Sequence, residues 1–397
     1  MKIGIIKEGK TPPDKRVPFS PEQCETLVKE FGLNLVVQPS KVRCFKDKEY
    51  SDLGVVLQED LSDCDVLFGV KEVRKEDLIP GKKYFFFSHT IKEQPYNKTL
   101  LQTLLAKQIQ MVDYECLQHN DGGRILGFGR YAGIVGSYNA LLAWGQRTKT
   151  FELKPANLCE DMTEITSELQ KIKLIDVKIV LTGNGRVAQG AIELLELAGI
   201  TGVKPEEYIK QSFDKAVYTQ MRCHHYYNLN DGKDFSYDHF YKNSKDYQVN
   251  FLPYLNPSDI FISCHYWDNE SGVLFNVEDC LTAEFKTKVI ADITCDIQGS
   301  VPSTLRSTTI ADPLFGFNPA TNSEVNTFDE NGITIMAVDN LPCELPKDAS
   351  KDFGKALIKN IIPELLNEDK NNIINRASIC LNGELNTYYQ YLKSYAS

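Results

Sequence analysis

The sequence predicts an α/β protein of two doubly wound units, each with helices on both faces of a mostly parallel sheet. The chain has 397 residues, too many for one compact core, which indicates two domains. Short apolar segments alternate with helical patterns, an order typical of parallel sheets. One such segment ends in a glycine-rich turn, as strands do in nucleotide-binding folds.

The first half of the chain supplies the first alternating unit. Its apolar segments have the lengths of buried strands, and the stretches between two pairs of them have helical periodicity. The predicted strands are Ile3–Ile6, Leu35–Val37, Val66–Val70, Tyr84–Phe87 and Gln110–Asp113. The predicted helices are Pro21–Phe31 and Tyr96–Lys107.

The second half repeats this pattern after a connecting helix at 133–147, whose small residues permit close packing. Residues 151–173 are predicted to be helical and polar, and 349–366 to be a helix near the end of the chain. A long insertion, 199–253, is rich in Tyr, His, Asp and Lys and is expected to be a surface subdomain or loop. The predicted strands are Val177–Leu181, Ile260–Cys264, Val289–Ile293 and Ile333–Val338.

Composition excludes several classes of protein. A net charge of −10 argues against a nucleic-acid-binding face, which would need to be basic. No apolar run approaches the roughly 18 residues of a membrane span, and the first residues are typical of a strand rather than a signal peptide. Eleven scattered cysteines without a Cys-x-x-Cys pair indicate reduced thiols. We therefore expect a cytoplasmic protein without a membrane or nucleic-acid partner.

A cofactor signal follows the strand Val177–Leu181. Gly183-Asn184-Gly185-Arg186-Val187-Ala188 reads Gly-x-Gly-x-x-Ala and leads into a helical sequence. In this motif the first glycine permits the turn, the second lets a pyrophosphate approach the backbone, and the small third residue packs helix against strand. The motif predicts NAD or NADP as cofactor. The residue that reads the ribose stays open, because Glu206 would favour NAD and Lys204 would favour NADP.

Polar groups follow the predicted strands of the first half. Lys71-Glu72 and Ser88-His89-Thr90-Ile91-Lys92 come directly after strands, and Arg16 lies in the loop after the first strand. Ligands of open parallel sheets bind beyond the carboxyl ends of the strands, so we expect these groups in one crevice. Arg16, Lys92 and Arg124 could hold carboxylates, while Lys71 and His89 could move protons.

Several motifs resemble the superfamily of alanine dehydrogenases and lysine-forming saccharopine dehydrogenases, and most strongly its lysine-ketoglutarate reductase module. The similarity runs across nearly the whole chain, the long insertion included. The segments that carry it are 4–18, 69–73, 87–92, 112–115, 128–133, His224-His225, Tyr266-Trp267, 291–300 and 338–346.

This resemblance implies two Rossmann-like domains with an active-site crevice between them. The substrate domain would comprise 1–134 and 345–397, and the dinucleotide domain 135–344 with the insertion near 200–253. Lys71 and His89 would be the acid–base pair, and Arg16, Lys92 and Arg124 the carboxylate ligands. The residues implied near the cofactor are Gly183, Gly185, Arg186, Val187, Ala188, Glu206, Asp292, Asp339, Asn340 and Leu341.

The implied reaction joins L-lysine and 2-oxoglutarate to give saccharopine, or reverses it, with Glu72, Glu115 or Asp296 as counter-charge for the free amino group of lysine. One alternative is an alanine dehydrogenase or another opine-type synthase. A second is a nicotinamide-binding sensor without turnover, disfavoured because Lys71 and His89 are both present. A zinc hydrolase using His224 and His225 is rejected, since adjacent histidines seldom reach one metal and no partner set accompanies them.

Overall fold

The structure is a computed structural model that describes residues 1–397, and it divides the chain into two units. The first unit comprises 1–128 and 346–397, and the second comprises 129–345. Each is built on an eight-stranded, mostly parallel sheet with helices, so the predicted α/β fold class is confirmed. No helix has the length and apolar character needed to cross a bilayer.

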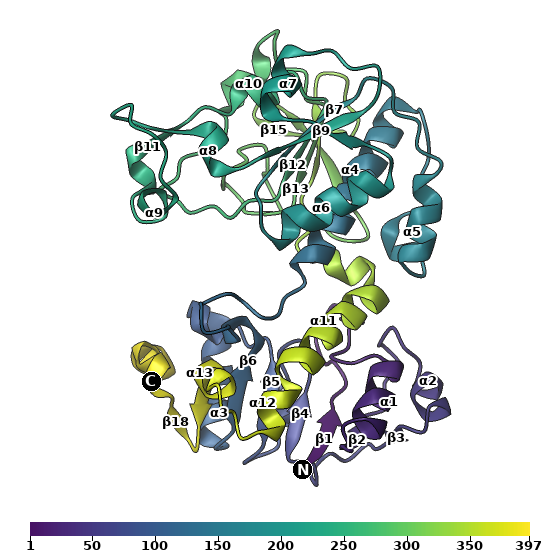
Figure 1. Cartoon of the computed structure of the whole chain (residues 1–397), viewed down its shortest axis with the longest axis vertical. Coiled ribbons are helices and arrows are strands. Elements are labelled where there is room, and N and C mark those ends of the chain that lie inside the picture. Colours follow the sequence, from purple (N-terminus) through teal and green to yellow (C-terminus); the bar gives the residue numbers. More distant parts are fainter. The chain divides into compact units, whose positions relative to one another are not determined.

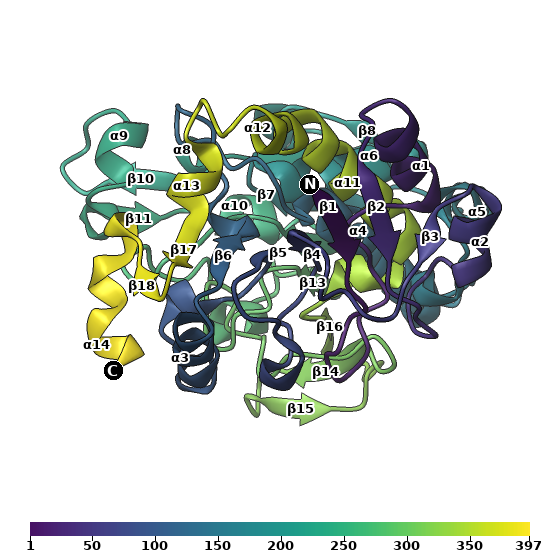
Figure 2. The same ribbon diagram turned by 90° about the horizontal axis from the view of Figure 1, so that it is seen from below.

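The first sheet has the order β18-β17-β6-β5-β4-β1-β2-β3 (Figure 2). Its six strands from β6 to β3 are parallel, and the β17–β18 hairpin adds an antiparallel edge. The strands are β1 (Lys2–Ile5), β2 (Asn34–Val37), β3 (Val56–Leu57), β4 (Val66–Phe68), β5 (Lys83–Phe86), β6 (Gln110–Asp113), β17 (Ser378–Leu381) and β18 (Glu384–Leu385). The helices are α1 (Pro21–Lys29), α2 (Asp47–Asp52), α3 (Lys98–Ala106), α11 (Pro346–Asn360), α12 (Ile362–Leu366), α13 (Ile373–Ala377) and α14 (Lys393–Ala396).

The second sheet has the order β15-β14-β16-β13-β12-β7-β9-β8, with β14 and β15 antiparallel to their neighbours. Its strands are β7 (Lys178–Thr182), β8 (Thr201–Gly202), β9 (Val217–Met221), β12 (Ile260–Ser263), β13 (Val289–Asp292), β14 (Leu314–Asn318), β15 (Ser323–Val325) and β16 (Ile333–Met336), and a separate hairpin joins β10 (Tyr227–Leu229) to β11 (Tyr247–Val249). The helices are α4 (Gly129–Thr148), α5 (Met162–Leu169), α6 (Arg186–Leu197), α7 (Pro205–Lys210), α8 (Cys223–Tyr226), α9 (Tyr237–Phe240) and α10 (Leu252–Leu255).

Close packing of α4 on α6 holds the glycine-rich turn in place (Figure 1). A Cβ on Gly133 would lie 1.9 Å from the carbonyl oxygen of Val187, and one on Gly190 would lie 1.9 Å from that of Arg130. The two backbones can approach only because both glycines lack side chains. The small residues predicted at 133–147 therefore pack this helix against the start of the glycine-turn helix.

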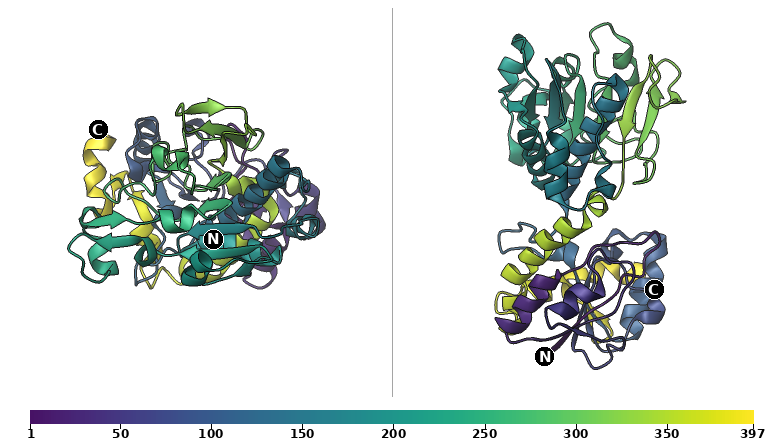
Figure 3. Two further views of the ribbon diagram at one scale, coloured as in Figure 1. Left: turned by 90° about the horizontal axis from the view of Figure 1, so that it is seen from above. Right: turned by 90° about the vertical axis from the view of Figure 1, so that its right-hand side faces the viewer.

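The C-terminal helix α11 returns to the first unit and lies beside α1 (Figure 3). Ser350 Oγ accepts a hydrogen bond of 2.9 Å from the backbone N–H of Val17, and Gln23 Nε2 donates one of 2.7 Å to the carbonyl of Lys351. These bonds attach the loop that contains Arg16 and the helix that follows it to a segment more than 300 residues away in the chain.

Three predicted elements are corrected by the structure. Most of 151–173 is not helical, because Pro155 interrupts it and the Asp161 side chain caps a short α5 instead. The helix predicted at 349–366 is split at Ile361, just before Pro363 at the start of α12. The insertion near 200–253 contains β9, a strand of the main sheet next to β7, so it is only in part a surface subdomain.

Candidate functional site

Four strand ends of the first sheet carry the ionisable groups. Glu8 lies three residues after β1, Lys71 three after β4, His89 three after β5 and Glu115 two after β6. These strands are parallel neighbours, so their carboxyl ends share one edge of the sheet. The spacing from each strand end, rather than any local motif, brings these side chains together.

His89 lies between two carboxylates. Its Nε2 is 3.6 Å from Glu72 Oε1, and its Nδ1 is 3.5 Å from Glu115 Oε2. All three side chains are about one-fifth exposed, so the group is shielded but can be reached. Each ring nitrogen of His89 thus faces a carboxylate oxygen. We call these three residues the histidine–carboxylate cluster.

The backbone of His89 is in the left-handed region, with φ 53°. Non-glycine residues rarely adopt it unless the surroundings hold them there. Here Ser88 donates its backbone N–H (3.0 Å) and its hydroxyl (2.5 Å) to Asp113 Oδ2. The other oxygen of Asp113 accepts the N–H of Glu115 at 2.7 Å. This fully buried carboxylate therefore links the two loops that carry the cluster.

Lys71 is held by Glu8, a residue that sequence reasoning missed. Glu8 accepts hydrogen bonds from the backbone N–H groups of Val70 (2.7 Å) and Lys71 (2.9 Å), and burial raises the pKa of Glu8 to about 8. Burial, followed by the positive charges of Arg16 and Lys10, lowers the pKa of the Lys71 amine. At a given pH, a larger fraction of Lys71 is therefore the neutral amine, which can accept a proton, than of a surface lysine.

Arg16, a candidate carboxylate ligand from the sequence, is buried and already has an acidic partner. Its side chain is only 2% exposed, Nε and NH2 bind Asp14 at 3.0 and 2.6 Å, and the guanidinium lies 4.1 Å from the centre of the Phe128 ring. Burial alone would raise the pKa of Asp14, but Arg16 lowers it overall. What the structure adds is the effect of Arg16 on Lys71, whereas binding of a substrate carboxylate by Arg16 stays a prediction.

Lys92 and Arg124 lie beside the cluster and are more exposed than Arg16. Lys92 Nζ is 3.3 Å and Arg124 NH2 is 3.8 Å from Glu115 Oε1, and their side chains are 48% and 40% exposed. The hydrogen bond from His89, together with the charges of Lys92 and Arg124, lowers the pKa of Glu115 to about 2. Two cations thus face solvent next to an ionised carboxylate and an imidazole.

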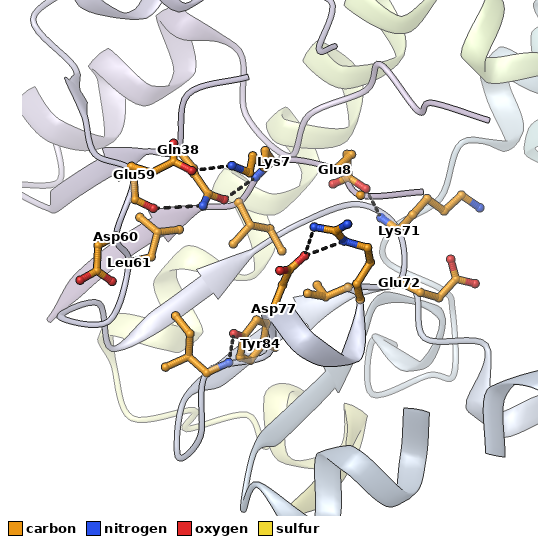
Figure 4. A pocket seen from close by; sticks show the side chains of 15 residues that line it. Lys7, Glu8, Gln38, Glu59, Asp60, Leu61, Lys71, Glu72, Asp77 and Tyr84 are labelled. Carbon is orange, nitrogen blue, oxygen red and sulfur yellow. Dashed lines mark hydrogen bonds and ion pairs between the residues drawn. The ribbon is translucent and has the colours of Figure 1, made fainter. Parts of the chain in front are cut away.

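A cavity of about 280 Å³ opens at this edge of the sheet. Figure 4 shows Lys71 and Glu72 at one end of this cavity. At the other end, Lys7, Gln38 and Glu59 are joined by hydrogen bonds and an ion pair. His89, Lys92 and Arg124 do not line this cavity. The side chains of Lys71 and His89 both lie near the ring of Phe87. Its centre is 6.0 Å from Lys71 Nζ and 6.1 Å from the imidazole centre.

The glycine-rich turn of the second unit follows β7 as predicted. Gly183 has φ 97°, and a Cβ there would lie 2.6 Å from the carbonyl oxygen of Cys264. By contrast, no atom lies within 4 Å of the Cβ position of Gly185, so its backbone is open to a ligand. Gly183, Gly185, Arg186 and Val187 line a cavity of about 450 Å³, a size usual for cofactor sites, while Ala188 is fully buried. These residues fit a pyrophosphate at the N-terminus of α6.

Other residues that the resemblance implies near the cofactor occupy the carboxyl ends of β13 and β16 but do not line this cavity. Asp292 ends β13, is fully buried and accepts hydrogen bonds from the Thr294 and Thr304 hydroxyls at 2.6 and 2.7 Å. Asp339, Asn340 and the buried Leu341 come in the loop after β16, beginning two residues beyond Ala337.

Glu206 is not at the position expected of a ribose reader. It follows β8, the next strand in the chain, but the strand beside β7 is β9. The first residue after β9 is Arg222. The strand β8 is instead a two-residue strand at the edge of the sheet, and the ribose reader stays open.

The remaining candidates have structural partners. His224 Nδ1 is 2.6 Å from Tyr237 Oη, and its ring centre is 4.0 Å from that of His225. Of the proposed counter-charges for a substrate amine, Glu72 and Glu115 flank His89, whereas Asp296 belongs to the second unit.

Comparison with known proteins extends the resemblance. Residues 4–135 match the family model of the alanine dehydrogenase/PNT N-terminal domain. The chain is 30% identical to alpha-aminoadipic semialdehyde synthase of Arabidopsis thaliana, over 98% of this chain and 41% of the relative. It is 24% identical to saccharopine dehydrogenase [NAD(+), L-lysine-forming] of Yarrowia lipolytica, over 91% of this chain and 92% of the relative.

The chain thus spans less than half the length of the Arabidopsis protein. Among solved structures, an L-alanine dehydrogenase superposes with a TM-score of 0.65 at 16% identity, covering 100% of both chains. This likeness supports the fold.

The Glu115 environment predicts a pH dependence of stability. Its pKa falls from 4.5 in the absence of these partners to about 2 in the fold. The ionised group therefore adds stability above pH 4.5, and this contribution disappears as the pH falls toward 2, by about 3 kcal/mol in all. Urea unfolding between pH 6 and 3 should show the stability gap between wild type and Glu115→Gln narrowing with acid. A constant gap, or the same narrowing for the exposed control Glu284→Gln, would contradict the electrostatic account.

Proposed function

Because the chain is a relative of the alanine dehydrogenase and saccharopine dehydrogenase superfamily, we propose that it is a nicotinamide-dependent oxidoreductase acting on the carbon–nitrogen bond of an amino acid. We propose further that it interconverts L-lysine plus 2-oxoglutarate and saccharopine. The observation that carries the proposal is the meeting of a lysine of lowered pKa with a histidine between two carboxylates at one sheet edge.

Lys71 acts first in this proposal. The amino group of the substrate must lose a proton before its lone pair can attack the keto carbon. A base with a pKa nearer to neutrality takes that proton more readily, and burial with two neighbouring cations lowers the pKa of Lys71. Glu8 holds the backbone of this lysine, so the amine is presented from a fixed position.

His89 acts on the second proton step. Attack gives a carbinolamine, whose hydroxyl must leave as water to form the imine. Glu72 and Glu115 face the two ring nitrogens and orient the imidazole, and a ring N–H can donate the proton that the departing hydroxyl needs. The bound dinucleotide supplies the hydride that reduces the imine.

Carboxylate binding is assigned to Lys92 and Arg124. Both cations are two-fifths to one-half exposed and lie within 4 Å of Glu115, which orients them beside His89. Arg16 stays a proposed ligand, and its buried ion pair with Asp14 makes its influence on Lys71 the better supported role. The glycine-rich turn at Gly183–Val187 would hold the pyrophosphate of NAD or NADP.

The lysine substrate is favoured by the negative charge at the site. The free amino group of lysine needs a counter-charge, and Glu72 and Glu115 place two carboxylates near His89, each also within an ion pair to a lysine. Ammonia or alanine would not need it. All eleven cysteines are free thiols, which suits a reducing compartment such as the cytosol, the location that we propose.

A substrate panel tests the proposed reaction. The purified chain, with NADH or NADPH, should oxidise the nucleotide only when L-lysine and 2-oxoglutarate are both present, and mass spectrometry should find saccharopine. Turnover with ammonia and pyruvate, without any need for lysine, would instead identify an alanine dehydrogenase. Nucleotide binding with no turnover for any amine and keto acid would favour a sensor.

The proposed acid–base pair predicts the effect of two substitutions. Lys71→Met and His89→Gln should each lower turnover by about 100- to 10,000-fold, the usual contribution of general acid–base catalysis. Affinity for NADH should stay within about 2-fold, because the glycine-rich turn belongs to the other unit. Each variant should also lose one limb of the pH–rate profile. The exposed controls Lys48→Met and His119→Gln should behave as wild type. Turnover within a few-fold of wild type in both site variants would contradict the assignment of Lys71 and His89 as the acid–base pair.

A further inference from the structure

The excursion between β9 and α10, residues 222–251, has no role in the proposed chemistry. It contains α8, the β10–β11 hairpin and α9, and Figure 1 shows it extending from the second sheet. It begins at the carboxyl end of β9, the strand beside the glycine-rich turn, where backbone N–H of Gly183 also donates to the carbonyl of Met221 at 2.8 Å. A segment of this size at this edge is placed to contact whatever binds the turn.

The excursion is packed around aromatic rings. Tyr227 and Phe240 have ring centres 4.5 Å apart, Phe240 and Tyr247 5.1 Å, and Phe235 and Tyr247 5.3 Å. Tyr227, Phe240 and Tyr247 are all buried. Such packing provides the apolar core that a short excursion needs, so its surface is preformed rather than ordered by a ligand.

One face of the excursion forms a wall of the cavity that contains the glycine-rich turn. Its wall residues are Cys223, Phe240, Tyr241 and Ser244. The facing wall follows β12 and consists of Cys264, His265, Tyr266, Asp268 and Ser271. Ser244 Oγ and Asp268 Oδ1 approach to 3.5 Å, so the two walls meet on one side of the cavity.

The facing wall is anchored by His265. Its Nδ1 is 2.7 Å from the hydroxyl of Thr182, at the end of β7, and its Nε2 is 2.9 Å from that of Ser300. Burial lowers the pKa of His265 to about 4, so the ring is neutral near pH 7. The residue that follows it, Tyr266, is therefore carried by a fixed backbone.

Two tyrosines that line the cavity, one from each segment, are unusually exposed for large rings. Tyr241 is 67% exposed and Tyr266 is 90% exposed, although their neighbours Phe240 and His265 are buried. Exposed aromatic rings beside a phosphate-binding turn are suited to stack on a nucleobase, since every base has an apolar face.

The sheet order decides which half of a dinucleotide these rings would meet. In doubly wound nucleotide-binding folds, the adenosine ribose lies at the carboxyl end of a strand next to the glycine-bearing strand. Of the two neighbours, it is the one that comes first in the chain after the glycine-rich turn. Here that strand is β9, which leads directly into the excursion. The nicotinamide half extends toward the other strand ends.

We propose that residues 222–251 form the adenosine-binding wall of the dinucleotide site, with Tyr241 and Tyr266 contacting the adenine ring from opposite sides. The inference rests on the nicotinamide cofactor of the proposed function and explains why the second unit carries the excursion. In this proposal the segment binds the cofactor and takes no part in proton or hydride transfer.

Calorimetric titration with ADP-ribose tests the assignment, because this probe has adenosine and pyrophosphate but no nicotinamide. Wild type should bind it, and Tyr241→Ala and Tyr266→Ala should each weaken binding by about 5- to 150-fold, the range measured for loss of one base–aromatic stack. Affinity for nicotinamide mononucleotide should not change. The matched control is Tyr96→Ala in the first unit, where the side chain is 68% exposed and lies far along the chain from the turn.

The outcomes separate this inference from the function beneath it. If wild type binds NADH and ADP-ribose and both tyrosine variants bind ADP-ribose equally well, the wall assignment is overturned while the oxidoreductase proposal stands. If wild type binds neither NADH nor ADP-ribose, both fail. Each variant should have the melting temperature of wild type, because both side chains are exposed. An unchanged melting temperature would show that a loss of affinity comes from the missing ring and not from unfolding.

Discussion

Parallel pairing of neighbouring strands is the constraint on which both sites depend. Parallel strands end at the same edge of a sheet, so a residue a few positions after each strand meets residues that are distant in sequence. In the first unit this gathers Glu8, Lys71, His89 and Glu115 from the ends of β1, β4, β5 and β6. In the second unit it gathers the glycine-rich turn, the excursion after β9 and the loop after β12.

Hydrogen bonds to carboxyl groups then fix the loops at these strand ends in one conformation. Asp113 joins the loop of His89 to that of Glu115, and Glu8 binds the backbone of Lys71. The Ser88–Asp113 and Lys71–Glu8 bonds each connect a strand end to its neighbour in the sheet. A buried carboxylate is costly unless it is hydrogen-bonded, so these contacts also define which conformations of the loops are stable.

The sequence was sufficient for the strands and the glycine-rich turn, because buried parallel strands are uninterrupted apolar runs and the turn follows one of them. It also placed Lys71 and His89 after strands, and their catalytic roles stay predictions. It could not give Glu8 or Asp113 their roles, since their partners Val70 and Ser88 lie 62 and 25 residues away in the chain. Strand order was also hidden. The short β8 comes before β9 in the chain but lies outside it in the sheet, so the strand beside β7 ends at Met221 rather than near Glu206. Burial of Arg16 likewise depends on Asp14 and Phe128 together.

The central claim is that a lysine of lowered pKa works at the edge of the first sheet, and the titration of that amine tests it most directly. In protein labelled with ε-¹³C lysine, the ε-carbon signal that is absent from Lys71→Arg should titrate below the signals of the exposed lysines. Burial and the charges of Arg16 and Lys10 predict this depression. A Lys71 signal that titrates together with the surface lysines would contradict the account.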